Sequence, residues 1–142
     1  MIKDYVDNAL TYLPDGTYFT LHYLHRKGFE HQLEDQGFDD TFYEGLLLND
    51  TRISKSTLCK ANVFVHGTIF SRNKAIVQMT INALEERDSE YLFEIANDIE
   101  EEYGIGLYSE LKKEHKPLRY NKYTEKIYRN DDVFLEEARS IR

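Results

Sequence analysis

The sequence predicts an α+β fold, mainly helical with short β-hairpins, built from two similar units packed together. Two observations support this prediction. In each half of the chain, apolar residues first recur at helical spacing and later alternate at strand spacing. The halves also repeat one order of elements, because Phe93 and Ile95 follow Phe19 and Leu21 at the same distance of 74 residues. A repeat of this kind indicates two units of about 70 residues each.

The first unit is expected to open with two helices separated by a short strand. Residues 5–13 place apolar side chains on one helical face, and the turn residues 14–16 end that helix. Residues 17–19 combine β-branched and aromatic side chains, which favours a brief strand. Thr20 then stands where a helix needs its N-cap, and Gly28 ends the second helix.

A third helix and a hairpin complete the first unit. Residues 30–37 predict a short helical turn, and Asp39 is the expected cap of the helix after it. The core positions of that helix are expected to be Phe42, Tyr43, Leu46 and Leu47. The period then changes, and residues 52–58 and 62–65 predict the two strands of a hairpin. Three helices followed by such a hairpin form a winged helix-turn-helix.

The second unit starts the same order again, so we expect winged-helix-like units over residues 1–68 and 69–142. Its predicted elements are a helix capped by Ser71 and running to Leu84, a strand at 91–93, a helix carrying Ile95, Ala96 and Ile99, a short helix at 107–115 stopped by Pro117, a strand or wing at 118–128, and a last helix capped by Asp131-Asp132.

Two pairs of segments resemble a known family. They are GTYFTLHYLHRKGF (residues 16–29) with GFDDTFYEGLLLND (37–50), and YLFEIANDIEEEYGI (91–105) with YNKYTEKIYRNDDVFLEEA (120–138). Together they resemble the tandem winged helix-turn-helix modules at the ends of larger bacterial proteins, and they are similar to the HARE-type domain of the bacterial RNA polymerase delta subunit. The resemblance implies a non-enzymatic role in transcription or on DNA, in a bacterial or phage protein. It transfers no individual functional residue.

Composition predicts a soluble, cytoplasmic protein. Of 142 residues, 41% are apolar, and the net charge is −8. No apolar run reaches the roughly 18 residues that a membrane helix needs, so no membrane partner is expected. The only cysteine, Cys59, excludes an internal disulfide and a multi-cysteine zinc site. His22, His25 and His31 lie close together, but without cysteine partners they are a weak metal signal. We expect no catalytic residue, metal or cofactor.

The charges are grouped in blocks. Residues 30–50 hold seven acids and no Lys or Arg, residues 85–102 hold nine acids and only Arg87, and residues 112–129 hold seven bases against two acids. Bases contact phosphates and tyrosines stack on nucleobases. We therefore predict a nucleic-acid-binding strip formed by Lys112, Lys113, Lys116, Arg119, Tyr120, Lys122, Tyr123, Lys126 and Arg129, with help from Arg52, Lys55 and Lys60 in the first hairpin. Two alternative interpretations of this strip remain: it is an ordinary solvated wing, or it contacts the acidic block at 85–102.

The third helix of the first unit argues against this interpretation, because a helix that reads a DNA groove needs basic or amide side chains. This one offers Asp39, Asp40 and Glu44, which repel phosphate. The alternative function is therefore an acidic protein-binding module that mimics nucleic acid, as phage-type inhibitors such as anti-CRISPR proteins do. Its partner would be a DNA- or RNA-processing protein complex. Its candidate residues are Asp39, Asp40, Glu44, Glu94, Asp98, Glu100, Glu101 and Glu102. A dimerisation or scaffold domain of a larger protein, with a homodimer, is the third possibility.

Overall fold

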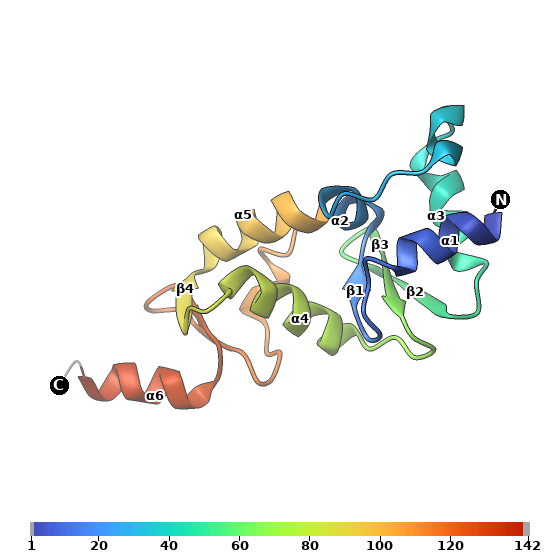
Figure 1. The fold of residues 1–142 in the computed structure, drawn as a ribbon. Helices are drawn as coiled ribbons and strands as arrows, with labels where there is room; N and C mark the ends of the chain where they lie inside the picture. The colour runs from blue at the N-terminus through green and yellow to red at the C-terminus, as the bar shows by residue number, and fades with distance from the viewer. Residues whose placement is uncertain (1, 141–142) are drawn as a thin grey trace. The chain divides into compact units, whose positions relative to one another are not determined.

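The computed structural model describes residues 2–140 and has an α+β fold with two antiparallel sheets of three strands each (Figure 1). The predicted α+β class is therefore confirmed. The described residues divide into two compact units. Unit 1 runs to Phe70 and includes Glu102–Gly104, and unit 2 comprises Ser71–Glu101 with the residues from Ile105 onward. The predicted boundary followed residue 68, whereas the boundary in the structure follows Phe70.

Unit 1 begins with helices and ends with a hairpin. Its elements are α1 (Ile2–Leu10), β1 (Tyr18–Phe19), α2 (Leu21–Arg26), the 3₁₀ turn η1 (Gln32–Gln36), α3 (Asp40–Leu48), β2 (Ile53–Leu58) and β3 (Ala61–His66). The strand order is β1-β3-β2, so β3 is the central strand. Phe19 of β1 pairs with Phe64 of β3, and their rings stack with centroids 5.5 Å apart. The brief strand thus joins the start of α2 to the hairpin.

Local signals set where the helices of unit 1 begin and end. Thr20 Oγ1 accepts a hydrogen bond from the Tyr23 amide, and Asp39 Oδ1 accepts one from the Phe42 amide, each at 3.1 Å. Both capping residues have extended backbone, as an N-cap requires. Gly28 follows α2 with φ of 100°, a conformation that glycine adopts without steric cost. The predictions for these three positions are confirmed.

In the core of unit 1, the helices pack their apolar faces against the sheet. Tyr5 of α1 lies edge-on to Phe29, with centroids 5.2 Å apart, and its hydroxyl donates to Glu34 Oε2 at 2.9 Å. Tyr43 and Leu47 of α3 are buried in the same cluster. Burial of these large side chains is the main source of stability of the unit.

Phe42 is not a core residue, although the helical spacing predicted that it would be. Its side chain is 39% exposed, and its ring lies 4.4 Å from that of the exposed Phe38. The inner stripe of α3 is filled by Tyr43, Leu46 and Leu47, so Phe42 falls at the edge of that stripe.

We predict that Asp50, which follows α3, stabilises the fold only when the pH is above the range in which its carboxyl group titrates. Arg52 donates hydrogen bonds to Asp50 through its backbone and guanidinium, and these bonds lower the pKa of Asp50 from 3.8 to about 2. Because the folded-state pKa is the lower one, the stabilisation is complete above the unfolded value and is lost as the pH falls toward 2. Asp50→Asn should reduce the free energy of unfolding by at most about 1 kcal/mol at neutral pH.

The measurement is urea unfolding of wild type and Asp50→Asn at several pH values. The difference between them should narrow as the pH falls from 4 toward 2. Asp35→Asn is the matched control, because Asp35 is exposed and makes no ion pair in the described residues. A difference that stays constant with pH would contradict the prediction.

Unit 2 repeats the order of elements of unit 1 except that, in the described residues, no α-helix corresponds to α3 and one more helix follows the hairpin. Its elements are α4 (Arg72–Leu84), β4 (Ser89–Tyr91), α5 (Leu92–Tyr103), the 3₁₀ turn η2 (Glu110–Lys112), β5 (Arg119–Asn121), β6 (Lys126–Tyr128) and α6 (Asp131–Ser140), with the last residues of α5 belonging to unit 1. The strand order β4-β6-β5 corresponds to β1-β3-β2. Ser71 caps α4, as predicted, by accepting a hydrogen bond from the Lys74 amide at 3.3 Å.

Three details of unit 2 differ from expectation. The short helix predicted at 107–115 is only the single turn η2, because the backbone is already extended at Lys113. Phe93 is not the counterpart of the buried Phe19: β4 ends at Tyr91, and Phe93 lies on the outer side of α5, 61% exposed. Asn130, rather than Asp131-Asp132, caps α6, because its Oδ1 accepts a hydrogen bond from the Val133 amide at 3.0 Å.

Candidate nucleic-acid interface

Four bases of the predicted strip surround one pocket of unit 2, with a volume of about 340 Å³. The pocket is lined by Lys112, Lys113, Lys116 and Arg119, together with Glu114, Leu118, Tyr120 and Asp131. Lys112 ends η2, Arg119 begins β5, and the loop between them supplies the other two bases. The structure thus brings part of the predicted strip together around a single concave surface, which we name the basic pocket.

A buried carboxylate organises the loop that forms the basic pocket. Glu110 is 8% exposed, and its carboxylate contacts Arg72 at 3.0 Å, Lys113 at 3.4 Å and His115 at 3.4 Å. Burial opposes ionisation of Glu110, but the neighbouring positive charges outweigh it and lower the pKa of this carboxyl group. Leu111 and Leu118 are buried on either side of the loop. The loop is therefore anchored from below while its lysines remain at the surface.

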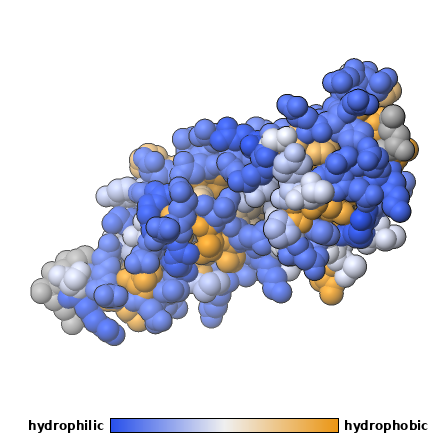
Figure 2. Space-filling model, viewed as in Figure 1, coloured by the Kyte–Doolittle hydropathy of each residue, from blue (hydrophilic) through white to orange (hydrophobic). Residues whose placement is uncertain are grey.

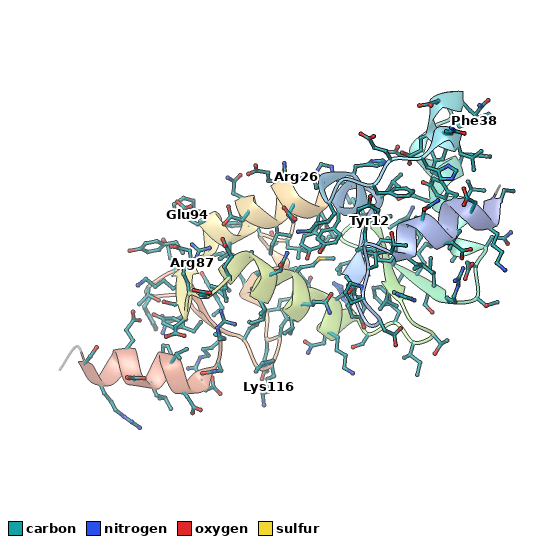
Figure 3. The ribbon with its side chains drawn as sticks, viewed as in Figure 1. Tyr12, Arg26, Phe38, Arg87, Glu94 and Lys116 are labelled. Atoms are coloured by element: carbon teal, nitrogen blue, oxygen red, sulfur yellow. The ribbon has the colours of Figure 1, made fainter. Side chains whose placement is uncertain are left out.

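Lys113 of the pocket contacts the buried Glu110, whereas Lys112, Lys116 and Arg119 each contact an exposed residue. Lys112 Nζ lies 4.6 Å from the centroid of the Tyr108 ring. Lys116 projects from its loop (Figure 3), 82% exposed, and contacts the exposed Glu114 at 3.5 Å. Arg119 contacts Asp131 of α6 at 3.1 Å. Exposed ion pairs contribute little to stability, so a phosphate can replace these partners at low cost.

The rest of the predicted strip is divided between structural and surface roles. Arg129 is structural, since its guanidinium donates to the carbonyls of Glu85 and Arg87 at 2.6 and 2.8 Å. Lys126 Nζ contacts Glu137 of α6 at 3.3 Å, and this hydrogen bond raises the pKa of Lys126. Lys122, in the turn between β5 and β6, is exposed.

The tyrosines of the strip also have different environments. Tyr120 is half-buried and lines the basic pocket, whereas Tyr123 is 85% exposed. Tyr128 is buried and donates a hydrogen bond to Glu137; burial, followed by this bond, raises the pKa of Tyr128. Tyr128 therefore belongs to the core side of β6. Sequence reasoning assigned no role to Tyr91 and Phe93, which the structure leaves exposed on the same unit.

The bases predicted in unit 1 do not form a comparable site. Arg52 is held by Asp50 at 2.8 Å and Asp7 at 2.7 Å. Lys55 is exposed on β2, and Lys60 lies at the hairpin turn, lining a separate pocket with Asp40 and Glu44, among others. The two acids weaken any attraction of phosphate to Lys60.

The acidic candidates Asp39, Asp40 and Glu44 lie in α3 or at its N-cap, and the same segment carries exposed apolar side chains. Asp39 and Asp40 are exposed, and Glu44 accepts a hydrogen bond from Asn62 at 3.1 Å. Phe38 is 53% exposed and Leu48 is 45% exposed. The surface visible in Figure 2 is hydrophilic over most of its area, with apolar patches between the hydrophilic regions. We name Phe38, Phe42 and Leu48 with the three acids the α3 face.

The acidic candidates on α5 do not form one continuous set. Glu102 belongs to unit 1 and contacts Arg26 at 3.6 Å and Lys27 at 3.2 Å. Asp98, in unit 2, contacts Arg87 at 3.7 Å. The remaining predicted acids on this helix are exposed: Glu94, which is labelled in Figure 3, Glu100 and Glu101.

Two histidines of unit 1 lie close to acidic side chains. His25 contacts Glu34 at 2.9 Å, and His31 contacts Asp4 at 2.8 Å. Within residues 2–140, no three His, Cys, Asp or Glu side chains converge in a way that would hold a metal ion. None of the helices in this range has both the length and the apolar character needed to cross a membrane.

Comparison of the chain with known protein families, with curated proteins and with solved structures finds no significant match.

Proposed function

We propose that this chain is a non-enzymatic nucleic-acid-binding protein made of two tandem winged helix-turn-helix units. Each unit has the order helix, short strand, helix, helical turn or helix, and hairpin, with the hairpin strand in the middle of a three-stranded sheet. Unit 1, with α3 before its hairpin, has the order of a winged helix, and unit 2 has the turn η2 at the place of α3. The similarity between the units supports the proposal, and the resemblance to the HARE-type domain agrees with it.

The observation that carries the proposed function is the basic pocket. It places four basic side chains of an acidic protein around one surface, and a buried carboxylate anchors the loop that bears two of them. Phosphate is the ligand that such a group of bases binds. In unit 2, the position of a groove-reading helix is occupied by the single turn η2. We therefore expect contacts with the sugar-phosphate backbone and little sequence preference.

The test is fluorescence anisotropy of labelled duplex and single-stranded DNA at low and physiological salt. If the four bases of the pocket contact phosphates, the logarithm of the affinity should fall with the logarithm of salt concentration with a slope of about −3 to −4. Binding that does not respond to salt would contradict a phosphate site. No binding at low salt would overturn the proposed function.

Helix α6 competes with DNA for one base of the pocket. Asp131 contacts Arg119, and no described residue of α6 is buried, so this acid is weakly held. Asp131→Asn should therefore raise the affinity for duplex DNA about two- to fivefold, the range of an exposed ion pair. Asp132→Asn is the matched control, because it removes the same charge from the same helical turn. Equal effects of the two variants in the anisotropy assay would contradict the role of Asp131.

The α3 face supports a second candidate function, the recognition of a protein. Its exposed rings and acids complement a protein surface of basic and apolar side chains. This function becomes the leading one if DNA does not bind at low salt. Its first test is a photo-crosslinker at Gly45, where added atoms meet open space. Crosslinking to a basic protein should be lost in Phe42→Ser.

A further inference from the structure

Three aromatic side chains are exposed at one end of the unit 2 sheet. Tyr91 is 46% exposed, Phe93 is 61% exposed and Tyr123 is 85% exposed. Tyr91 ends β4, Phe93 is the second residue of α5, and Tyr123 lies in the turn between β5 and β6. They come from parts of the chain about 30 residues apart, which β pairing brings to one end of the sheet.

The register of the sheet fixes this arrangement. Tyr91 pairs with Lys126, and Lys126 pairs on its other side with Asn121. The Asn121 side chain accepts a hydrogen bond from the Tyr123 amide at 2.8 Å, and the Leu92 amide donates to the Glu125 carbonyl at 2.8 Å. The turn is thus bonded to the start of α5. Since neighbouring strands are about 4.8 Å apart, β4 and β5 lie about 10 Å from each other across β6.

Two of the rings stack on each other, and a lysine ammonium group lies over the ring of Tyr91 and another over that of Tyr123. Tyr91 and Phe93 are stacked, with centroids 6.2 Å apart and an angle of 26° between planes. Lys126 Nζ lies 5.3 Å from the centroid of Tyr91, and Lys122 Nζ lies 5.3 Å from that of Tyr123. Exposed rings beside lysines are the combination that binds single-stranded nucleic acids, whose bases stack while their phosphates meet the cations.

We infer that Tyr91, Phe93 and Tyr123 form a stacking platform for unpaired nucleobases, and that the ligand of unit 2 is a single strand of nucleic acid. This inference rests on the proposed function and names its ligand class. Duplex bases are already stacked and offer no free face to a ring, whereas a single strand does. Arg119 and Tyr120 connect the basic pocket to the turn along β5. A strand whose phosphates occupy the pocket is thereby led toward the platform.

Two exposed acids limit how the strand lies. Glu94 follows Phe93, Glu125 is the last residue of the turn, and both are exposed. Glu90 is instead held by Arg87 at 2.7 Å. Phosphates are therefore expected to stay on the side of Lys122 and Lys126, with the bases over the rings.

The experiment uses the full-length chain with labelled oligo-dT, oligo-U and a duplex of the same length, about 15 nucleotides, which covers one binding site of this kind. Tyr123→Ala and Phe93→Ala should each weaken single-strand binding at least about fivefold, because stacking of one base contributes that much or more. Duplex binding should be unchanged. Tyr123→Phe should restore the affinity and Tyr123→Leu should not, because only the former keeps a flat ring. Tyr12→Ala, which removes a 40% exposed ring from unit 1, is the control.

A spectroscopic variant reports stacking directly. The chain has no tryptophan, so Tyr123→Trp adds a single fluorophore at the platform. Its fluorescence should be quenched when oligo-dT or oligo-U binds and should not respond to duplex. Equal quenching by both oligomers indicates recognition of bases, and a preference for one identifies DNA or RNA as the natural strand.

The outcomes separate the inference from the proposed function. Duplex binding, together with single-strand binding that is not weakened in the Tyr123 and Phe93 variants, would overturn the platform and leave the basic pocket in place. Single-strand binding that depends on Tyr123 and not on the pocket lysines would support the platform and overturn the pocket. No binding of any oligonucleotide at low salt would overturn both.

Discussion

Replacing Lys112 and Lys116 together by glutamate should lower the affinity for nucleic acid about 100-fold near 0.1 M salt, since each lost phosphate contact costs roughly a factor of ten there. Neither side chain is needed for the fold. Lys112 rests on the ring of Tyr108, and Lys116 is paired only with the exposed Glu114. The variant should therefore unfold at the same denaturant concentration as wild type while its anisotropy titration shifts.

The matched control for this variant is Lys55→Glu with Lys60→Glu, which changes the net charge equally in unit 1. Its effect should be small, because Lys60 shares its pocket with Asp40 and Glu44. An equal loss in the control would show that affinity follows total charge and not the basic pocket.

The largest effect on stability is expected for Phe19→Ala, at about 3–5 kcal/mol. Phe19 is fully buried, pairs with Phe64 across the sheet, and stacks on its ring. Truncation leaves a cavity where β1, β3 and α2 meet, because packed cores relax only partly. The measurement is urea unfolding followed by circular dichroism.

Phe19→Leu is the control for this prediction, because it keeps most of the volume and should cost less than half as much. Hydrogen exchange should place the loss in unit 1 and leave α4 and α5 protected. A loss below about 1 kcal/mol would mean that Phe19 does not hold β1 against the hairpin.

Features that depend on neighbouring residues were predictable from the sequence. Thr20, Asp39 and Ser71 cap their helices as expected, because each cap needs only a short polar side chain and an amide two or three residues ahead. The hairpin of residues 53–66 was also predictable, because strand-like alternation of side chains is visible in the local sequence.

Exposure at the margin of a helix was not predictable. Phe42 fits an apolar helical pattern, and Phe93 was expected in a strand as the counterpart of Phe19, yet both lie outside the core. Periodicity gives the direction of a side chain but not the width of the surface that its helix packs against, and short helices leave edge positions uncovered.

The candidate site, too, was predictable from the sequence only in part. Grouped charges identified the bases of residues 112–129, but the sequence could not show which partners hold them. Arg129 binds carbonyls from a segment more than 40 residues earlier, and Lys126 meets Glu137 only because α6 folds back on β6. Tyr91 joins Tyr123 through strand pairing, which no local pattern reveals. Long-range contacts of this kind require the folded structure.

The most direct test of the central claim, that the basic pocket binds nucleic acid, is lysine acetylation footprinting with and without oligonucleotide at low salt. We predict protection of Lys112, Lys113 and Lys116, with Lys55 and Lys60 modified equally in both samples. Protection of Lys55 and Lys60 without the pocket lysines, or no protection at any of the five, would contradict the account.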